Sequence, residues 1–413
     1  MINISLSPNN TWRDTLKALE QLILPWNWLS WKNGSARTKL ESELAKWAGV
    51  EKAMAVGSGR EALYLILKAL ELPENSEVIL QSFTCMVVSN SIIWNGLKPV
   101  YADIDETYNL DPAKLENLIN ERTKVVMVQH TFGIPAQIIR IREICRKHKL
   151  ILIEDCAHAM GAEALDADGQ MRKVGTFGEA AFYSMGRSKV ISCVSGGLII
   201  AKEKLLNEKI YKQYLKLNET KTAKIFQNLM HPLICSLAKA TYGILIGKIV
   251  MVMAQKMRLI NFEVTPKEKK GEIDNNFPTK LPNALAKLAL IQFGLLNEFN
   301  QRRRLIAKQY FEELGGINPG ENPGAIYLRY PLQIKSNEQV FDSAKRAGFI
   351  IGDWYQTPIA PLDVDIIKSG YVDGSCPKAE LMGKEVINLP TMPGLSDDKV
   401  RKVAQVIKKF TQK

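Results

Sequence analysis

Short apolar segments alternate with helical patterns from residue 51 onward, and this alternation constrains the fold more than any other feature of the chain. Helical patterns such as REALYLILKAL (60–70) and IIRIREICRKH (138–148) lie between the apolar segments. An alternation of this kind is typical of a mostly parallel sheet with helices on both faces. We therefore predict an α/β fold with a seven-stranded sheet. The expected strands are AMAV (53–56), EVIL (77–80), PVYADID (99–105), KVVMVQH (124–130), LILIED (150–155), AAFYS (180–184) and GGLIIA (196–201).

The pattern changes after Lys202 to long, lysine-rich helical segments, and one strong helix is predicted over 281–314. The Gly/Pro-rich stretch GGINPGENPGA (315–325) interrupts the chain, and we expect a smaller α+β lobe after it. The predicted organisation is an N-terminal segment (1–45), a large domain (46–280) with a basic helical insert (205–276), and a connecting helix with a small C-terminal domain (281–413).

Composition narrows the class of protein. The chain of 413 residues is 46% hydrophobic and 24% charged, which is ordinary for a globular protein. Its six cysteines are scattered without CxxC spacing, which argues against a zinc site and a disulfide framework and favours a reducing cytoplasm. The start, MINISLSPNNTW, lacks the pattern of a secretory signal.

The net charge of +12 suggests an anionic ligand, a nucleic acid or an anionic membrane surface as a partner. Between Lys202 and Lys270 lie fourteen Lys and Arg but only five Asp and Glu, so nine of the twelve excess charges fall there. Nucleic acid is disfavoured, because no nucleic-acid-binding motif is present and the basic residues do not interleave with aromatic ones.

Polar residues gather at the expected strand ends, where α/β sheets carry their chemistry. In VGSGREAL, the residues Gly57, Ser58 and Gly59 separate a strand from a helix. Small residues there let backbone N–H groups and the helix N-terminus face a phosphate, although a plain tight turn has the same sequence. In LILIEDCAHAMGA, Asp155 is placed to hold a protonated ring nitrogen or simply to cap a helix, and His158 is compatible with a packing role.

Lys189, in FYSMGRSKVISCVSGG, is the third element. Most lysines are solvated surface charges, whereas a reactive lysine must be partly neutral and so needs burial or cationic neighbours. A phosphate-binding turn, an acid at a strand end and a lysine after a later strand are together the parts that hold pyridoxal 5′-phosphate (PLP), whose protonated ring takes up electrons.

Several longer motifs agree with this combination in order and spacing. They are LESELAKWAGVEKAMAVGSGREAL, QSFTCMVVSNSIIWNGLKPVYADID, HTFGIPA, IEDCAHAMGA and CPKAELMGKEVINLPTMPGLSDDKVRKVAQVI. With these motifs the chain resembles the DegT/DnrJ-type sugar aminotransferases, PLP enzymes with the fold of aspartate aminotransferase, from about Ser35 to its C-terminus.

The resemblance implies a role for each matching residue. Lys189 is the expected Schiff-base lysine and proton carrier, Asp155 pairs with the pyridine nitrogen, and Phe83 stacks on the ring. His158 stands where the family more often has glutamine, near the ring hydroxyl. The residues expected to hold the cofactor phosphate are Ser58, Gly59, Arg60 and Ser184.

The sequence departs from the family pattern at two places. Arg60 replaces a small hydroxyl residue, so that it either adds a charge to the phosphate site or points away and leaves only its N–H there. The family has an Asn-Tyr-Arg segment that completes the neighbouring subunit's site, and this chain has Pro278, Thr279 and Lys280 in its place. The resemblance also implies a homodimer.

The least family-like stretch contains GILIGKIVMVMAQKMRLI (243–260), which predicts an amphipathic helix. Ile246, Ile249, Val250, Met253 and Met257 recur at helical spacing, with Lys248 and Gln255 opposite and Lys256 and Arg258 flanking them. One interpretation packs this apolar face against the protein itself or its dimer partner. The other lays it on an anionic membrane surface.

These observations predict a PLP-dependent aminotransferase that converts a keto sugar, carried on a nucleotide, to an amino sugar with glutamate as donor. One alternative is another PLP-dependent reaction on a sugar, such as dehydration, although the known enzymes of that kind replace the lysine with histidine. The other is a non-catalytic binding or regulatory protein with the same fold.

Overall fold

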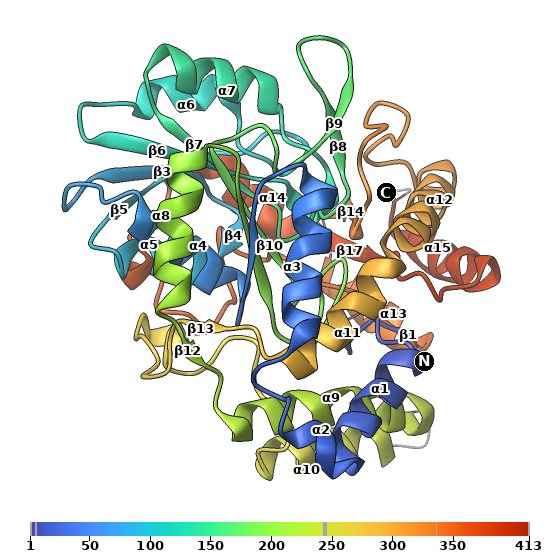
Figure 1. Ribbon diagram of the computed structural model, residues 1–413. Coiled ribbons are helices and arrows are strands. Elements are labelled where there is room, and N and C mark those ends of the chain that lie inside the picture. The colour runs from blue at the N-terminus through green and yellow to red at the C-terminus, as the bar shows by residue number, and fades with distance from the viewer. Residues whose placement is uncertain (1, 5, 243–245, 336, 412–413) are drawn as a thin grey trace.

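A nine-stranded sheet forms the centre of the molecule (Figure 1). The computed structural model describes residues 2–4, 6–242, 246–335 and 337–411. The strands follow the order β12-β13-β2-β11-β10-β7-β6-β3-β5. Their bounds are β2 Ala53–Val56, β3 Glu77–Gln81, β5 Lys98–Ala102, β6 Thr123–Gln129, β7 Ile151–Asp155, β10 Ala180–Ser184, β11 Gly197–Ala201, β12 Asn218–Glu219 and β13 Thr279–Lys280.

All seven predicted strands are present, and the predicted α/β fold is confirmed. Strands β10, β7, β6, β3 and β5 run parallel to their neighbours within this group, and β11 is antiparallel to both β10 and β2. The two additional strands, β12 and β13, are two residues long and extend the sheet beyond β2.

Apolar residues on the two faces of the sheet belong to two separate cores. In β2, Met54 and Val56 pack into one core and Ala53 and Ala55 into the other, because successive side chains of a strand point to opposite faces. Helices cover both faces, as predicted. They include α3 Ser35–Ala48, α4 Gly59–Ala69, α5 Met86–Ile93, α6 Pro112–Leu115, α7 Ile138–Lys147, α8 Lys204–Leu215 and α11 Asn283–Gly294.

The prediction of one continuous helix over 281–314 is wrong. Helix α11 ends at Gly294, and α12 Leu296–Leu314 begins after Leu295, whose φ and ψ are −99° and 0°. Glycine is a poor helix former, and the two helices have different partners: α11 packs on α3, and α12 packs on α15 Asp397–Thr411. The first helix therefore ends at Gly294, a weak helical position, because the two halves of the predicted helix pack on different partners.

The chain after Leu314 forms a small set of strands and helices. Strand β14 Arg329–Gln333 pairs with β17 Val386–Pro390, and α13 Asn337–Arg346 and α14 Pro377–Glu385 lie between them in the sequence. Two short pairings tie this part to the rest: β1 Ile2–Asn3 with β15 Phe349–Ile350, and β4 Thr84–Cys85 with β16 Ile359–Ala360. The second pairing brings the segment around Trp354 to the carboxyl end of β3.

The part of the basic insert after α8 folds beside the N-terminal helices (Figure 1), whereas α8 packs on α4. Helix α9 Thr222–Thr241 packs against both α1 Trp12–Ile23 and α10 Ile246–Lys256, and α2 Pro25–Trp28 follows α1. The helix predicted over 243–260 ends at Lys256, since Arg258 has a φ of +55° that no α-helix accommodates. Residues 243–245 of that prediction lie outside the described residues.

Candidate active site

One cavity of about 790 Å³ opens at the carboxyl ends of the strands, and seven of the eight predicted site residues line it. Ser58 follows β2, Asp155 ends β7, and Ser184 ends β10. The residues that reach the cavity are Ser58, Gly59, Arg60, Asp155, His158, Ser184 and Lys189.

The turn between β2 and α4 carries the predicted phosphate site. The Ser58 hydroxyl caps α4 by accepting the N–H of Glu61 at 3.4 Å. The Gly57 N–H donates to the Glu61 carboxylate and to the Thr279 carbonyl, both at 2.9 Å, and these bonds fix the turn. The first N–H groups of α4, which have no partner inside the helix, therefore remain at the cavity wall.

Two glycines, Gly59 and Gly197, allow close contacts in this part of the cavity wall. A Cβ at Gly59 would lie 3.1 Å from Cβ of Ser184, so the serine hydroxyl lies beside the helix N-terminus. A Cβ at Gly197 would lie 2.2 Å from the Ser58 carbonyl oxygen, so only glycine fits at the start of β11. Gly197 therefore shapes the turn, and Gly196 beside it lines the cavity.

Arg60 turns its guanidinium away from the helix end. It pairs with the buried Glu268 carboxylate and donates a hydrogen bond to the Glu263 carbonyl oxygen at 2.5 Å. Burial alone would lower the pKa of Arg60, but the charge of Glu268 outweighs it and raises the pKa. Of the two alternatives for Arg60, the structure shows the second, with the side chain bound to the segment 258–277 and only the backbone N–H left at the turn.

Asp155 is buried at the end of β7. One carboxylate oxygen accepts the N–H of Ala157 at 2.9 Å. No helix follows β7 directly, so this bond holds a turn and is not the helix cap that the sequence allowed. Burial raises the pKa of Asp155 to about 6, and the nearby positive charge of Lys189 opposes this rise. A cationic partner in the cavity would stabilise the ionised carboxylate further.

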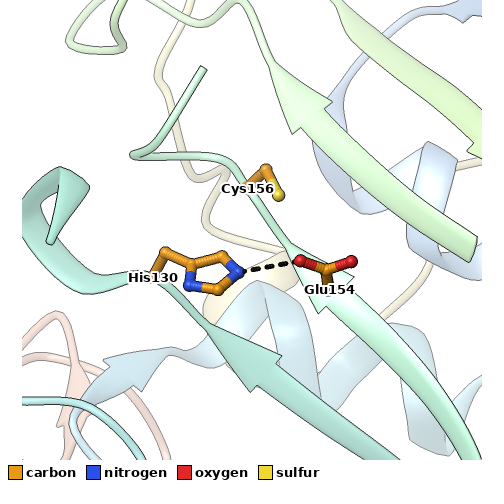
Figure 2. A group of neighbouring side chains, drawn as sticks. All are labelled: His130, Glu154 and Cys156. Atoms are coloured by element: carbon orange, nitrogen blue, oxygen red, sulfur yellow. Dashed lines mark hydrogen bonds and ion pairs between the residues drawn. The ribbon is translucent and has the colours of Figure 1, made fainter. Parts of the chain in front are cut away.

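The neighbouring acid, Glu154, points to the other face of the strand (Figure 2). Its carboxylate accepts N–H bonds from Gly175, Phe177 and Gly178, each at 2.7 Å, and from Nε2 of His130 at 3.1 Å. Nδ1 of His130 accepts the Ala136 N–H, so His130 is neutral with its proton on Nε2. Although Cys156 lies close by, these bonds already occupy the ligand atoms of His130 and Glu154 that a metal ion would need.

His158 lines the cavity in its neutral form. Its Nδ1 accepts the Phe132 N–H, and its Nε2 lies 3.4 Å from the Tyr355 hydroxyl. Burial lowers the pKa of His158 well below its usual value, and the charges of Lys189 and Arg329 lower it further.

Lys189 lines the cavity, as do Lys224 and Lys269. Burial lowers its pKa, and Arg329 adds to this effect, while the charge of Asp155 opposes it. Its Nζ lies 5.0 Å from the ring centroid of Trp354. The position of Lys189 therefore matches a reactive amine rather than a solvated surface charge.

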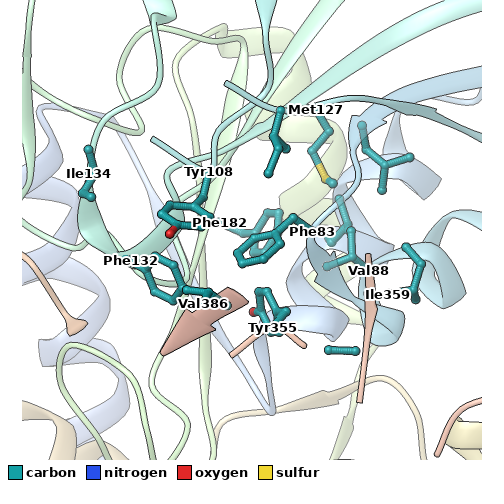
Figure 3. Packing of buried hydrophobic residues seen from close by; sticks show 14 of the residues in the cluster. Phe83, Val88, Tyr108, Met127, Phe132, Ile134, Phe182, Tyr355, Ile359 and Val386 are labelled. Carbon is teal, nitrogen blue, oxygen red and sulfur yellow. The ribbon is translucent and has the colours of Figure 1, made fainter. Parts of the chain in front are cut away.

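The structure contradicts the placement of Phe83. Its side chain is fully buried in an aromatic cluster, with ring centroids 5.1 Å from Tyr108, 5.3 Å from Tyr355 and 6.0 Å from Phe132 (Figure 3). Phe83 has a φ of +66°, which interrupts the alternation of side chains that a strand would give. Cys85, two residues later, lines the cavity in its place.

Sequence reasoning missed the residues that close the cavity. Trp354 and Tyr355 reach it from the C-terminal part of the chain, and Glu263 and Asn276 reach it from the segment after α10. The amide nitrogen of Asn276 is buried without a hydrogen-bond partner. The aromatic pair in GDWYQTP was the only local signal for any of them.

The residues that replace the family's Asn-Tyr-Arg segment lie between β12, the edge strand, and β2. Thr279 and Lys280 form β13, and the Lys280 amine donates to the Leu215 carbonyl at 3.3 Å. Among the described residues, Lys280 does not line the cavity. Asn276, just before this segment, does.

The residues present fit pyridoxal phosphate. The end of α4 and Ser184 form a cradle for phosphate, Asp155 offers a buried acid, Lys189 offers an amine with a lowered pKa, and Asn276 has an unused N–H donor. A fold of this kind with these groups around one cavity defines a PLP-dependent enzyme.

Residues 13–408 match the DegT/DnrJ/EryC1/StrS aminotransferase family, and the chain belongs to this family. The predicted class is thereby confirmed, and the protein is a PLP-dependent aminotransferase.

Similar proteins cover nearly the whole chain. The pleiotropic regulatory protein of Geobacillus stearothermophilus is 26% identical over 382 residues, which cover 90% of this chain and 88% of the relative. The UDP-N-acetyl-3-dehydro-α-D-glucosamine 3-aminotransferase of Acidithiobacillus ferrooxidans is 25% identical over 383 residues, covering 91% and 89%. The solved structure of NtdA from Bacillus subtilis, with the cofactor PMP bound, has a TM-score of 0.74 at 17% identity and covers 100% of this chain and 85% of that chain.

Proposed function

We propose that the protein transfers an amino group from glutamate to a keto sugar carried on a nucleotide. Family membership supports the reaction type, and the Acidithiobacillus ferrooxidans relative carries the name of an enzyme for a UDP-linked keto sugar. The cavity of about 790 Å³ is larger than the cofactor alone needs, and Lys224, Gln227 and Arg258 of the insert line it. These polar and basic side chains suit a substrate that bears a diphosphate.

Each residue of the cavity has a role in this proposal. When bound, PLP supplies an aldehyde and a ring that takes up electrons. Lys189 would be the attachment point of the cofactor, and its Nζ would carry a proton between the two reacting carbons. Asp155 would keep the ring nitrogen protonated, and neutral His158 would contact the ring. Ser184 and the N–H groups at the start of α4 would hold the phosphate.

The observation that carries the proposal is that the Lys189 amine and the Asp155 carboxylate line one cavity with the N-terminus of α4. Absorption spectra of the purified, PLP-loaded protein test it. We expect a yellow band that bleaches when glutamate is added, and we expect Lys189→Ala to lose this response. A protein that takes up no PLP, or whose band ignores every amino donor, would support a regulatory role instead. Mass spectrometry of nucleotide keto sugars would then identify the acceptor.

We also propose a homodimer, on the resemblance of the chain to its family. Light scattering coupled to gel filtration gives the molar mass directly. A mass near 46.4 kDa, that of one chain, would refute the dimer.

The apolar face of α10 is exposed on the protomer, with Ile246, Ile249, Met253 and Met257 open to solvent and Val250 half-buried. This face therefore does not pack into the core of its own chain. Helices α1 and α2 lie in the same group of helices and add further exposed apolar residues, which are Trp12, Leu16, Ile23, Trp26, Trp28 and Leu29. None of the helices in the described ranges is long and apolar enough to cross a membrane.

We propose that this face lies on an anionic membrane surface, because lysines and arginines surround it in a segment that holds most of the excess positive charge. Co-sedimentation with phosphatidylglycerol vesicles should retain the wild type and release Ile249→Glu/Met253→Glu. Loss of the dimer in that double variant, without any vesicle binding by the wild type, would assign the face to the subunit interface.

A further inference from the structure

The segment that carries Lys189 lies outside the sheet, between β10 and β11. Two backbone bonds close it, from the Met185 N–H to the Gly196 carbonyl at 2.8 Å and from the Cys193 N–H to the Met185 carbonyl at 3.1 Å. The Lys189 amine forms no hydrogen bond or ion pair with a described residue, and it lies 5.0 Å from the centroid of the Trp354 ring. Because a lysine amine ends a flexible alkyl chain, its location depends on how firmly the backbone of Lys189 is held.

Asn9, far away in the sequence, holds this backbone. Its side-chain nitrogen donates to the Lys189 carbonyl and, at 3.2 Å, to the Val190 carbonyl, across 180 and 181 positions of the chain. The side chain of Asn9 is buried, with 3% of the residue exposed. An amide nitrogen has two donors, so a single side chain holds two successive peptide units of the segment.

Arg303, in α12, determines which end of the Asn9 amide faces these carbonyls. Its guanidinium donates to the side-chain oxygen of Asn9 at 2.9 Å and to the Val190 carbonyl at 2.7 Å. Since a guanidinium only donates, the oxygen of Asn9 must face Arg303 and the nitrogen must face Lys189. Arg303 is buried without an ion pair among the described residues, and burial lowers its pKa to about 9. An unpaired cation is costly to bury, so Arg303 and the Lys189 segment stabilise each other through these bonds.

The residues on either side of Asn9 are bound to helix α9 of the insert. The Ser7 hydroxyl lies 2.7 Å from Nε2 of His231. The Asn10 side chain donates to the Ser236 hydroxyl at 3.1 Å. Asn9 lies between these two bonds, so it is itself fixed and does not follow the Lys189 segment. A group that positions a reactive side chain needs this kind of support.

We propose that Asn9 is a positioning residue that sets where the Lys189 amine lies relative to the cofactor. The inference rests on the proposed role of Lys189 as the attachment point and adds the residue that supports it. A displacement of about 1 Å between reacting groups costs about 100-fold in rate, so Asn9 acts on the reaction without touching the cofactor or the substrate. If its bonds served the fold alone, stability and function would fall together in every variant.

Two replacements of nearly the same size separate the donor of Asn9 from its acceptor. Asn9→Asp keeps an oxygen for Arg303 but presents a second oxygen to the Lys189 carbonyl, and an ionised carboxylate cannot donate. Asn9→Leu removes both the donor and the acceptor. Asn10→Asp is the matched control, because the side chain of Asn10 bonds to α1 and α9 and not to the Lys189 segment.

Two readouts follow the lysine. Mass spectrometry measures the share of bound PLP that borohydride fixes to Lys189, and absorbance measures the rate at which glutamate bleaches the yellow band. We expect Asn9→Asp to reduce the fixed share and to lower the bleaching rate about 100-fold. This variant should still take up PLP, because Ser184 and the start of α4 are unchanged. Asn10→Asp should match the wild type in both readouts.

Thermal unfolding of the cofactor-free proteins shows whether a loss comes from the fold. Asn9→Leu should melt at a lower temperature than Asn9→Asp, since it leaves the buried Arg303 with one acceptor fewer. In the two readouts of the lysine, Asn9→Asp should be the more impaired, because its carboxylate repels the Lys189 carbonyl. The proposal would be overturned if Asn9→Leu were the more impaired in function as well as in stability. A wild-type fixed share and bleaching rate in Asn9→Asp would overturn it too.

A failure of the proposed function gives a different result. If borohydride fixes no PLP to Lys189 in the wild type, the proposed role of Lys189 is wrong, and the inference about Asn9 falls with it. If PLP is fixed but glutamate does not bleach the band, the proposed donor is wrong, and the fixed share in Asn9→Asp alone decides the role of Asn9.

Discussion

Replacing Gly197 with alanine tests whether this glycine shapes the phosphate turn. A Cβ at this position would lie 2.2 Å from the carbonyl oxygen of Ser58, 2.3 Å from its carbonyl carbon and 2.7 Å from the Gly59 nitrogen. All three are backbone atoms, so no side chain can rotate out of the way. Restoring ordinary van der Waals contact requires a backbone shift of about 1 Å, and overpacking of this kind costs about 1–3 kcal/mol.

The shift occurs in the turn that holds the start of α4, so its effect on the cofactor should exceed its effect on the fold. A displacement of about 1 Å in a binding group is worth about 100-fold, and we expect Gly197→Ala to weaken PLP binding by that factor. Absorbance titration measures the PLP affinity, and thermal unfolding of the cofactor-free protein measures stability.

Gly196→Ala is the matched control for Gly197→Ala. Its Cβ would meet Cε of Met185 at 2.8 Å and Sγ of Cys193 at 2.9 Å, which are ends of side chains that can move. This variant should bind PLP within about threefold of the wild type, since its clash is relieved away from the turn. Equal PLP affinity in the two alanine variants would refute the argument that the turn depends on Gly197.

Three other variants test single contacts. Because burial raises the pKa of Asp155 from 3.8 to about 6, its contribution to stability is complete below pH 3.8 and is lost as the pH rises through 6. Over that pH range, the free energy of unfolding of the cofactor-free wild type should therefore fall by about 3 kcal/mol relative to that of Asp155→Asn, as measured by urea unfolding. Parallel pH profiles of the two proteins would contradict this prediction. Arg60→Met breaks the buried pair with Glu268 and should destabilise the protein by about 3 kcal/mol. Proteolysis within 258–277 should become faster, because this segment loses its contact with Arg60. The PLP affinity should stay within about threefold of the wild type, because only the backbone N–H of residue 60 is at the turn. Phe83→Leu should lower the melting temperature by about 1–2 °C, from about 1–2 kcal/mol of lost packing, and should leave the spectrum of bound PLP unchanged. A changed spectrum would return Phe83 to the cofactor site.

The sequence was sufficient for the strands and for the polar residues that follow them. Each strand is a short apolar run whose burial follows from its own composition, and the seven runs that were predicted all lie in the sheet. The carboxyl ends of neighbouring parallel strands share an edge, so Asp155 and Ser184 meet as a consequence of the order of the elements. The resemblance to a family added the role of Lys189, which no local pattern distinguishes from a surface lysine.

Positions next to these residues show where sequence reasoning failed. Phe83 and Cys85 are two residues apart, and a regular strand would point them the same way, but the positive φ of Phe83 sends its ring into the aromatic cluster. The direction of Arg60 depends on Glu268, which lies 208 residues later in the chain. The break at Leu295 depends on α3 and α15, which hold the two halves of the predicted helix separately.

The sequence by itself determined the elements, their layers and the groups that meet at the strand ends, because these depend on local composition and on the fixed geometry of helices and strands. Only the tertiary structure decided which side chains close the cavity. Trp354 and Glu263 come from segments far from Lys189 in the chain, and their directions follow from packing among residues that no sequence pattern links.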